Sequence, residues 1–259
     1  MIHFWLSLIM VVVSIPGIIL MSVHSSKLLS EKPENESVSK RTLFMLVTLQ
    51  TLIIVALASA SGAYLGPKVG LGDSFIEGII NNEFNMQSLL EQVTWGLVGG
   101  IICSLVWMFS YYVIIRPKLD AETVRISEIL RNRLGLWTRI TSGGIVEEVL
   151  FRWGLLSLVA WGLSFIISSP VLVFWLSIVI TGLLFGWLHL PANIQEGCKP
   201  SVWFVATALL GNLWVSLFCG YLFWQYGILS AFIVHILFHV LWYPLDMRSY
   251  KHHLIATRS

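Results

Sequence analysis

The sequence predicts an all-α fold, a polytopic transmembrane helical bundle of about seven spans with an amphipathic helix at the cytoplasmic interface. Of the 259 residues, 56% are hydrophobic and only 12% are charged. A soluble domain carries about 25% charged residues, so this chain has too little charge to solvate an ordinary surface. Long apolar segments and the placement of lysine and arginine support the same fold class.

Seven apolar segments are long enough to cross a bilayer, which takes about 20 residues. The fourth is longer than necessary and is expected to tilt or kink. The first lacks the basic start and the small-residue cleavage site of a secretory signal, so we expect it to be an anchor. The predicted spans are residues 2–23, 43–65, 93–115, 138–168, 170–190, 202–224 and 227–245.

Basic residues gather on one side of this topology. The loops 24–42, 116–139 and 191–201 and the tail 246–259 hold fourteen of the sixteen lysines and arginines, whereas the alternate loops hold only Lys68. Cytoplasmic loops are enriched in positive charge. The N-terminus is therefore expected outside and the C-terminus in the cytoplasm, with an odd number of spans between them.

Four regions follow from this topology. Residues 1–115 form the N-terminal transmembrane helices, and residues 138–245 form a second group of spans. Between them, residues 116–137 place leucine and isoleucine at near-helical spacing among charges, which predicts an amphipathic helix on the cytoplasmic surface; a charged linker is the alternative. Residues 246–259 are expected to be a cytoplasmic tail, and residues 66–92 an outer loop.

Charge and cysteine usage exclude some classes of function. A net charge of +2 gives no reason to expect a nucleic acid as partner. The three cysteines form no CxxC pair, so they predict neither a disulfide framework nor a zinc ribbon. No internal repeat is visible, which argues against a transporter built from inverted repeats.

Besides His3 and Arg139 at the starts of two spans, six acidic, basic or histidine side chains lie inside the predicted spans, where a charged residue costs about 2.5–3.5 kcal/mol on insertion scales. Such residues normally face the protein interior and carry function. They are Glu147, Glu148, Arg152, His189, His235 and His239.

The spacing of these residues places them in pairs. Glu148 and Arg152 are four residues apart and share a helix face, whereas Glu147 is rotated by about 100° and points elsewhere. One carboxylate can thus be neutralised while the other stays free. His235 and His239 are also four apart. Structural ion pairing and histidine packing are the alternative interpretations of each pair taken alone.

Three short motifs in the second half of the chain resemble those of a known family. EEVLFR, from Glu147 to Arg152, resembles the E-E-x-x-x-R motif of the CAAX prenyl protease and bacteriocin-processing (CPBP) family. FGWLH, from Phe185 to His189, resembles its F-x-x-x-H motif, and HILFH, ending at His239, resembles its H-x-x-x-N motif. The resemblance covers about residues 137–245 and is closest to the type II CAAX prenyl endopeptidases.

The resemblance implies an intramembrane glutamic endopeptidase that hydrolyses peptide bonds of membrane-associated proteins, prenylated or otherwise anchored. Glu147 would be the general base that activates a water, helped by His189. His235 and His239 would stabilise the oxyanion.

The remaining motif residues would support this site. Glu148 and Arg152 would hold it together, with Phe185 beside them. Peptide hydrolysis needs an activated water, an oxyanion donor and a proton for the leaving amine, and these residue types can supply all three.

The sequence departs from the family motif at its last position, where His239 stands in place of asparagine. A neutral imidazole offers one N–H donor and an amide offers two. The departure leaves a zinc site open as an alternative, with Glu147, His189, His235 and His239 as ligands and an open position for water. The resemblance favours a mechanism without a metal or other cofactor.

Two further hypotheses belong to other classes of protein. A non-catalytic membrane scaffold or immunity-type partner of the same fold would fit the altered last motif. A proton-coupled transporter would use the glutamate and histidine residues as a relay. The lipid bilayer and a membrane-associated protein or peptide are the expected partners, and a bacterial inner or plasma membrane is the expected location.

Overall fold

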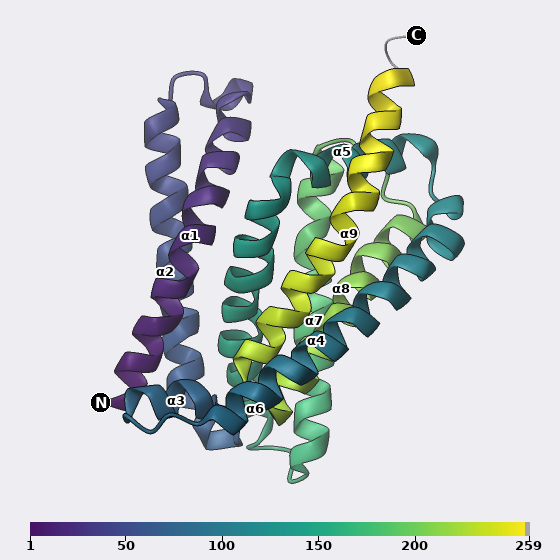
Figure 1. Ribbon diagram of the computed structural model, residues 1–259. Coiled ribbons are helices and arrows are strands. Elements are labelled where there is room, and N and C mark those ends of the chain that lie inside the picture. The colour runs from purple at the N-terminus through teal and green to yellow at the C-terminus, as the bar shows by residue number, and fades with distance from the viewer. Residues whose placement is uncertain (257–259) are drawn as a thin grey trace.

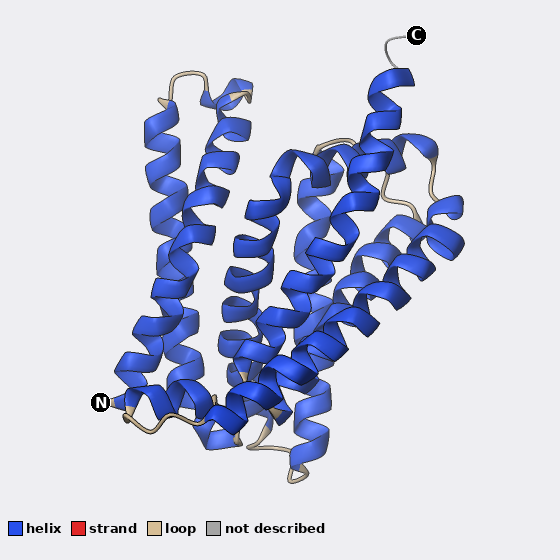
Figure 2. Cartoon of the chain, viewed as in Figure 1, coloured by secondary structure: helices blue, strands red, loops and turns tan. Residues whose placement is uncertain are grey.

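The chain folds entirely into helices and their connections in the part that the structure describes. The computed structural model describes the backbone of residues 1–256 and the side chains of residues 1–248. Helix makes up 87% of the structure, and no strand occurs in the described range (Figure 2). The predicted all-α class is confirmed.

Most helices begin at a side chain that accepts a hydrogen bond from the backbone of the first turn, as Ser39, Asp73, Asn85, Asp120 and Ser201 do. The α-helices are α1 (Ile2–Ser30), α2 (Lys40–Leu65), α3 (Ser74–Ile80), α4 (Met86–Phe109), α5 (Ala121–Thr138), α6 (Ser157–Leu163), α7 (Pro170–Gln195), α8 (Val202–Gln225) and α9 (Ile228–Ala256). The π-helical stretches are η3 (Ser110–Ile115), η5 (Arg139–Val146) and η6 (Val149–Leu156).

Six helices in the described part of the chain are long and apolar enough to cross a membrane. They correspond to six of the seven predicted spans. The remaining span is the continuous helical segment formed by η5, η6 and α6, here called the motif helix (residues 139–163). It carries four charged residues, Arg139, Glu147, Glu148 and Arg152, which is more charge than a lipid-facing span tolerates.

Several predicted boundaries are wrong by up to a few turns. The expected outer loop at 66–92 contains α3, and α4 already begins at Met86. The charged-linker alternative for residues 116–137 is wrong, because α5 is a helix. The tail expected at 246–259 is helical as far as Ala256, as a continuation of α9, and residues 257–259 lie outside the described range.

The motif helix lies between the other elements. Helices α1 and α2 pack against each other as a pair, and both also contact the motif helix; α9 contacts it as well (Figure 1). Helix α4 packs along α9, and α7 packs along α8. The N-terminus and the described end of α9 lie at opposite ends of the bundle (Figure 1), as an odd number of crossings requires.

The outward faces of the long helices expose large apolar side chains. Leu57 on α2 is 67% exposed and Phe109 on α4 is 63% exposed. Contiguous apolar surface of this kind would be unfavourable in water but matches the hydrocarbon of a bilayer. The chain is therefore an integral membrane protein.

Small residues let α2 approach the motif helix closely. A Cβ on Gly154 would collide with Ala58, and a Cβ on Gly62 would collide with the ring of Trp153. The indole Nε1 of Trp153 donates to the Ser59 carbonyl at 3.0 Å. These contacts fix the position of the motif helix along the axis of α2. They therefore also fix the position of the glutamates that the motif helix carries.

Candidate active site

The two motif glutamates occupy a short α-helical junction between two π-helical stretches. η5 ends at Val146, η6 begins at Val149, and Glu147 and Glu148 lie between them. π-Helical turns widen the helix locally and occur frequently at functional sites. The helical path is broken shortly before this segment at Gly135, inside α5, which has a φ of 70°.

Glu148 is completely buried and held by two partners. Its Oε1 lies 2.6 Å from the Nδ1 of His235 and 3.1 Å from the Nη1 of Arg152. The contact with Arg152 is an ion pair without hydrogen-bond alignment. With an imidazole and a guanidinium against one oxygen, Glu148 is a structural carboxylate that joins the motif helix to α9.

Arg152 connects Glu148 to residues on α7 and α8. Its Nη2 donates to the Oγ of Ser216 on α8 at 2.8 Å. Its guanidinium carbon lies 5.1 Å from the centre of the Phe185 ring on α7, within cation–π distance. Phe185 is 2% exposed and packs with its ring edge-on to His189. The expected supporting residues thus form one buried group.

Glu147 has a different environment. Its side chain is 24% exposed, and its Oε2 lies 3.9 Å from the Nε2 of His235. It lines a cavity of about 250 Å³. Adjacent glutamates thus have separate surroundings, one closed and ion-paired and the other open to a cavity.

The cavity brings together the four residues that sequence analysis assigned to catalysis. Glu147, His189, His235 and His239 all line it. They come from the motif helix, α7 and α9, and the rings of His235 and His239 stack with their centres 4.8 Å apart.

The partners of His189 and His235 assign their proton positions. The Nδ1 of His189 lies 2.7 Å from the Phe185 carbonyl oxygen, which only accepts hydrogen bonds. The Nδ1 of His235 faces the Glu148 carboxylate. Both neutral rings therefore carry the proton on Nδ1 and keep a lone pair on Nε2, as expected for groups that accept a proton from water or from Glu147.

Several polar residues at the site were not predicted, among them Arg139, Asn212 and Asp246. Arg139, assigned from sequence to a cytoplasmic segment, and Asn212 on α8 both line the cavity. Asp246, assigned to the tail, is fully buried and paired with Arg139 at 2.9 Å. Asp246 could have been predicted from its spacing, because it follows His239 by seven residues and so lies on the same face of the helix.

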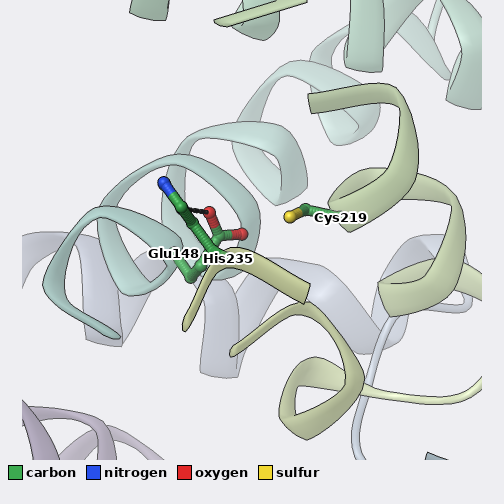
Figure 3. A group of neighbouring side chains, drawn as sticks. All are labelled: Glu148, Cys219 and His235. Atoms are coloured by element: carbon green, nitrogen blue, oxygen red, sulfur yellow. Dashed lines mark hydrogen bonds and ion pairs between the residues drawn. The ribbon is translucent and has the colours of Figure 1, made fainter. Parts of the chain in front are cut away.

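Among the described residues, one group of side chains has metal-ligand spacing, and it differs from the zinc set that the sequence left as an alternative. Its members are Glu148, Cys219 and His235, whose ligand atoms all lie within 4.8 Å of one another. Figure 3 shows Glu148 and His235 facing each other, with Cys219 to one side. The Arg152 cation beside Glu148 opposes a second cation there, and binding a metal would separate Glu148 from His235. This donor set fits a zinc ion poorly.

Comparison with known protein families gives a match in the second half of the chain. Residues 131–241 match the family model described as Rce1-like, type II CAAX prenyl endopeptidase. This range is similar to Rce1-like domains, and the match supports the resemblance to the CPBP and CAAX protease family. The matched range includes all three motifs and every residue assigned to the site except Asp246. No curated protein and no solved structure matches the chain. An Rce1-like domain implies a membrane protease that acts on protein substrates.

Proposed function

We propose that this Rce1-like chain is an intramembrane glutamic endopeptidase that hydrolyses peptide bonds of membrane-associated proteins. The contrast between the two motif glutamates carries the proposal. Glu148 is closed off by Arg152 and His235, whereas Glu147 faces a cavity that three histidines also line. A general base needs access to water and a partner that accepts protons, and only Glu147 has both.

The reaction can be written with these groups alone. Glu147 removes a proton from a water in the cavity, and the resulting hydroxide attacks the peptide carbonyl carbon. The Nε2 lone pairs of His189 and His235 hold the water and the proton. When the carbon–nitrogen bond breaks, the proton passes to the leaving nitrogen, so the products are a carboxylic acid and an amine. The oxyanion formed meanwhile needs an N–H donor, which we expect from α9.

We propose that the reaction proceeds without a metal, and the contacts of Glu148 and His235 support this. Glu148, the carboxylate in the cluster with metal-ligand spacing, already pairs with Arg152, and its Oε1 lies 2.6 Å from the Nδ1 of His235. The water is then activated by a carboxylate and imidazoles rather than by a Lewis acid. Zinc bound by the cavity histidines is the competing mechanism.

The topology proposed with this function has the N-terminus outside and the C-terminus in the cytoplasm of a bacterial inner or plasma membrane. The division between residues 1–115 and 138–245 then separates a scaffold of spans from the catalytic core. Helix α5 would lie at the cytoplasmic interface. Prenylated or otherwise anchored peptides would enter from that side, near Arg131 and Arg139 at the cavity wall.

Cleavage of prenylated and membrane-anchored peptides by the chain in nanodiscs tests the proposal. Glu147→Gln should lower the cleavage rate by about 10²–10⁴-fold, whereas Glu91→Gln, a matched change at an exposed position on α4, should leave it unchanged. Chelation should leave the wild-type rate unchanged. Loss on chelation with recovery on adding zinc would instead support a metalloprotease. A Glu147→Gln chain that still performs its cellular role would favour the scaffold hypothesis.

A further inference from the structure

Arg139 connects a catalytic-cavity histidine to a buried carboxylate. Its Nη1 lies 2.9 Å from the Oδ2 of Asp246, and its Nε donates to the Nδ1 of His239 at 3.5 Å. Arg139 is 4% exposed and Asp246 is fully buried. Arg131 contacts the other oxygen of Asp246 at 3.0 Å, so the carboxylate holds two guanidinium groups in place.

This contact determines where His239 carries its proton. A guanidinium group has five N–H donors and no acceptor. The Nδ1 that faces Arg139 must therefore be the unprotonated nitrogen of a neutral ring, which leaves the proton on Nε2. His189 and His235 have the opposite arrangement, because their Nδ1 atoms face a carbonyl and a carboxylate. The three cavity histidines are not equivalent.

The Nε2 of His239 is a buried polar atom without a hydrogen-bond partner among the described side chains and backbone. It lies against Gly143, where a Cβ would collide with it. Gly143 and His239 both line the cavity that contains Glu147. Buried polar groups are nearly always paired, so the Nε2 of His239 is a donor beside the cavity that has no partner among the described residues.

We propose that Arg139, anchored by Asp246, is a positioning residue that fixes His239 in the Nε2–H tautomer, so that His239 presents the N–H donor to the oxyanion. The mechanistic part rests on the proposed function, but the tautomer itself does not. In this arrangement His189 and His235 accept protons, and His239 alone of the three neutral rings donates at Nε2.

The tautomer can be measured without any substrate. The experiment is nitrogen NMR of the chain in nanodiscs with ¹⁵N-labelled histidine, the His239 signals being assigned by their absence in His239→Asn. Wild type should show a protonated Nε2 and an unprotonated Nδ1 at His239. Arg139→Met should shift the ring toward the other tautomer. Arg131→Met is the matched control, because it removes a guanidinium from the same carboxylate but keeps the contact with His239.

A wild-type signal with the proton on Nδ1 would overturn the proposal, even if Arg139→Met did not fold. The same conclusion would follow if Arg139→Met left the tautomer unchanged. Asp246→Asn, which frees Arg139 without removing it, should give an intermediate shift. None of these outcomes depends on cleavage, so they are distinguishable from failure of the proposed function.

Kinetics then test whether the tautomer matters for hydrolysis. Loss of one oxyanion donor costs about 10²–10³ in kcat, so Arg139→Met should lower kcat by up to that factor with little change in KM. In a His239→Asn background, whose amide needs no tautomer, Arg139→Met should add little further loss. Equal losses in both backgrounds would mean that Arg139 only supports the fold.

Discussion

The Nδ1 of His235 lies 2.6 Å from the Oε1 of Glu148, where both side chains are almost completely buried. The contact joins the motif helix to α9, residues 87 positions apart in the chain. It also orients the imidazole so that Nε2 points toward Glu147. Glu148 thus determines how the ring of His235 is oriented toward Glu147.

Glu148→Ala should destabilise the chain strongly, because it leaves the Arg152 cation buried without its counter-charge. Breaking a buried ion pair from one side costs about 3–5 kcal/mol. Thermal unfolding in detergent should show this loss, whereas Glu147→Gln should unfold near the wild-type temperature while losing cleavage by about 10²–10⁴-fold. Equal destabilisation by the two changes would contradict the assignment of separate roles.

Gly143→Ala should impair both packing and hydrolysis. The added Cβ would collide with the His239 ring, and overpacking a tight site costs about 1–3 kcal/mol. The matched control is Gly162→Ala on α6, where a Cβ meets nothing within 4 Å. That change should stabilise the helix by about 0.5–1 kcal/mol. The prediction would be refuted if Gly143→Ala and Gly162→Ala shifted the melting temperature in the same direction.

Stability should depend on pH through Asp73, which lies outside the spans at the start of α3. Its Oδ1 accepts hydrogen bonds from the Ile76 backbone at 2.9 Å and from Gln92 at 3.1 Å. Burial raises its pKa above the ordinary value, and these hydrogen bonds oppose the rise. The folded state therefore binds this proton more tightly than the unfolded state does.

The sign of the effect follows from linkage. The contribution of Asp73 to the unfolding free energy is largest below its unfolded pKa of about 3.9 and is lost as the pH rises through the folded pKa. The difference in stability between wild type and Asp73→Asn should accordingly fall as the pH is raised from about 4. Melting curves of both chains across this pH range test the prediction. A stability difference that rises with pH would contradict it.

Cys219→Ala should leave hydrolysis largely intact. Cys219 lies with Glu148 and His235 in the cluster that has metal-ligand spacing, but the proposed reaction makes no use of its thiol. Its Sγ contacts the Ala231 carbonyl at 3.7 Å, so the change costs packing alone. Metal analysis of both purified chains is the measurement, and zinc that disappears together with activity in Cys219→Ala would move the mechanism to a metal.

Much of the site could be predicted from spacing within single helices. Glu148 and Arg152 are four apart and form the expected ion pair, and Glu147 points elsewhere, into the cavity. Both outcomes follow from helical geometry over one turn. The π-helical stretches on either side could not be predicted in this way, because their turns change the angular position of each later residue.

The network around Asp246 could not be predicted because its parts come from three elements. Arg131 lies on α5, Arg139 on η5 and Asp246 on α9, and each looks like an ordinary charge near a membrane surface. Ser216, which receives the Arg152 hydrogen bond, is similarly inconspicuous in an apolar span.

The sequence by itself determined the all-helical membrane fold, the family resemblance and the set of glutamates and histidines at the site, since apolar length and residues one turn apart are properties of one segment. Only the tertiary structure decided which glutamate is closed off, which nitrogen of each histidine carries the proton, and that Asp246 belongs to the core. Those properties depend on the partner that each polar atom meets, and here the partner usually lies on a different helix.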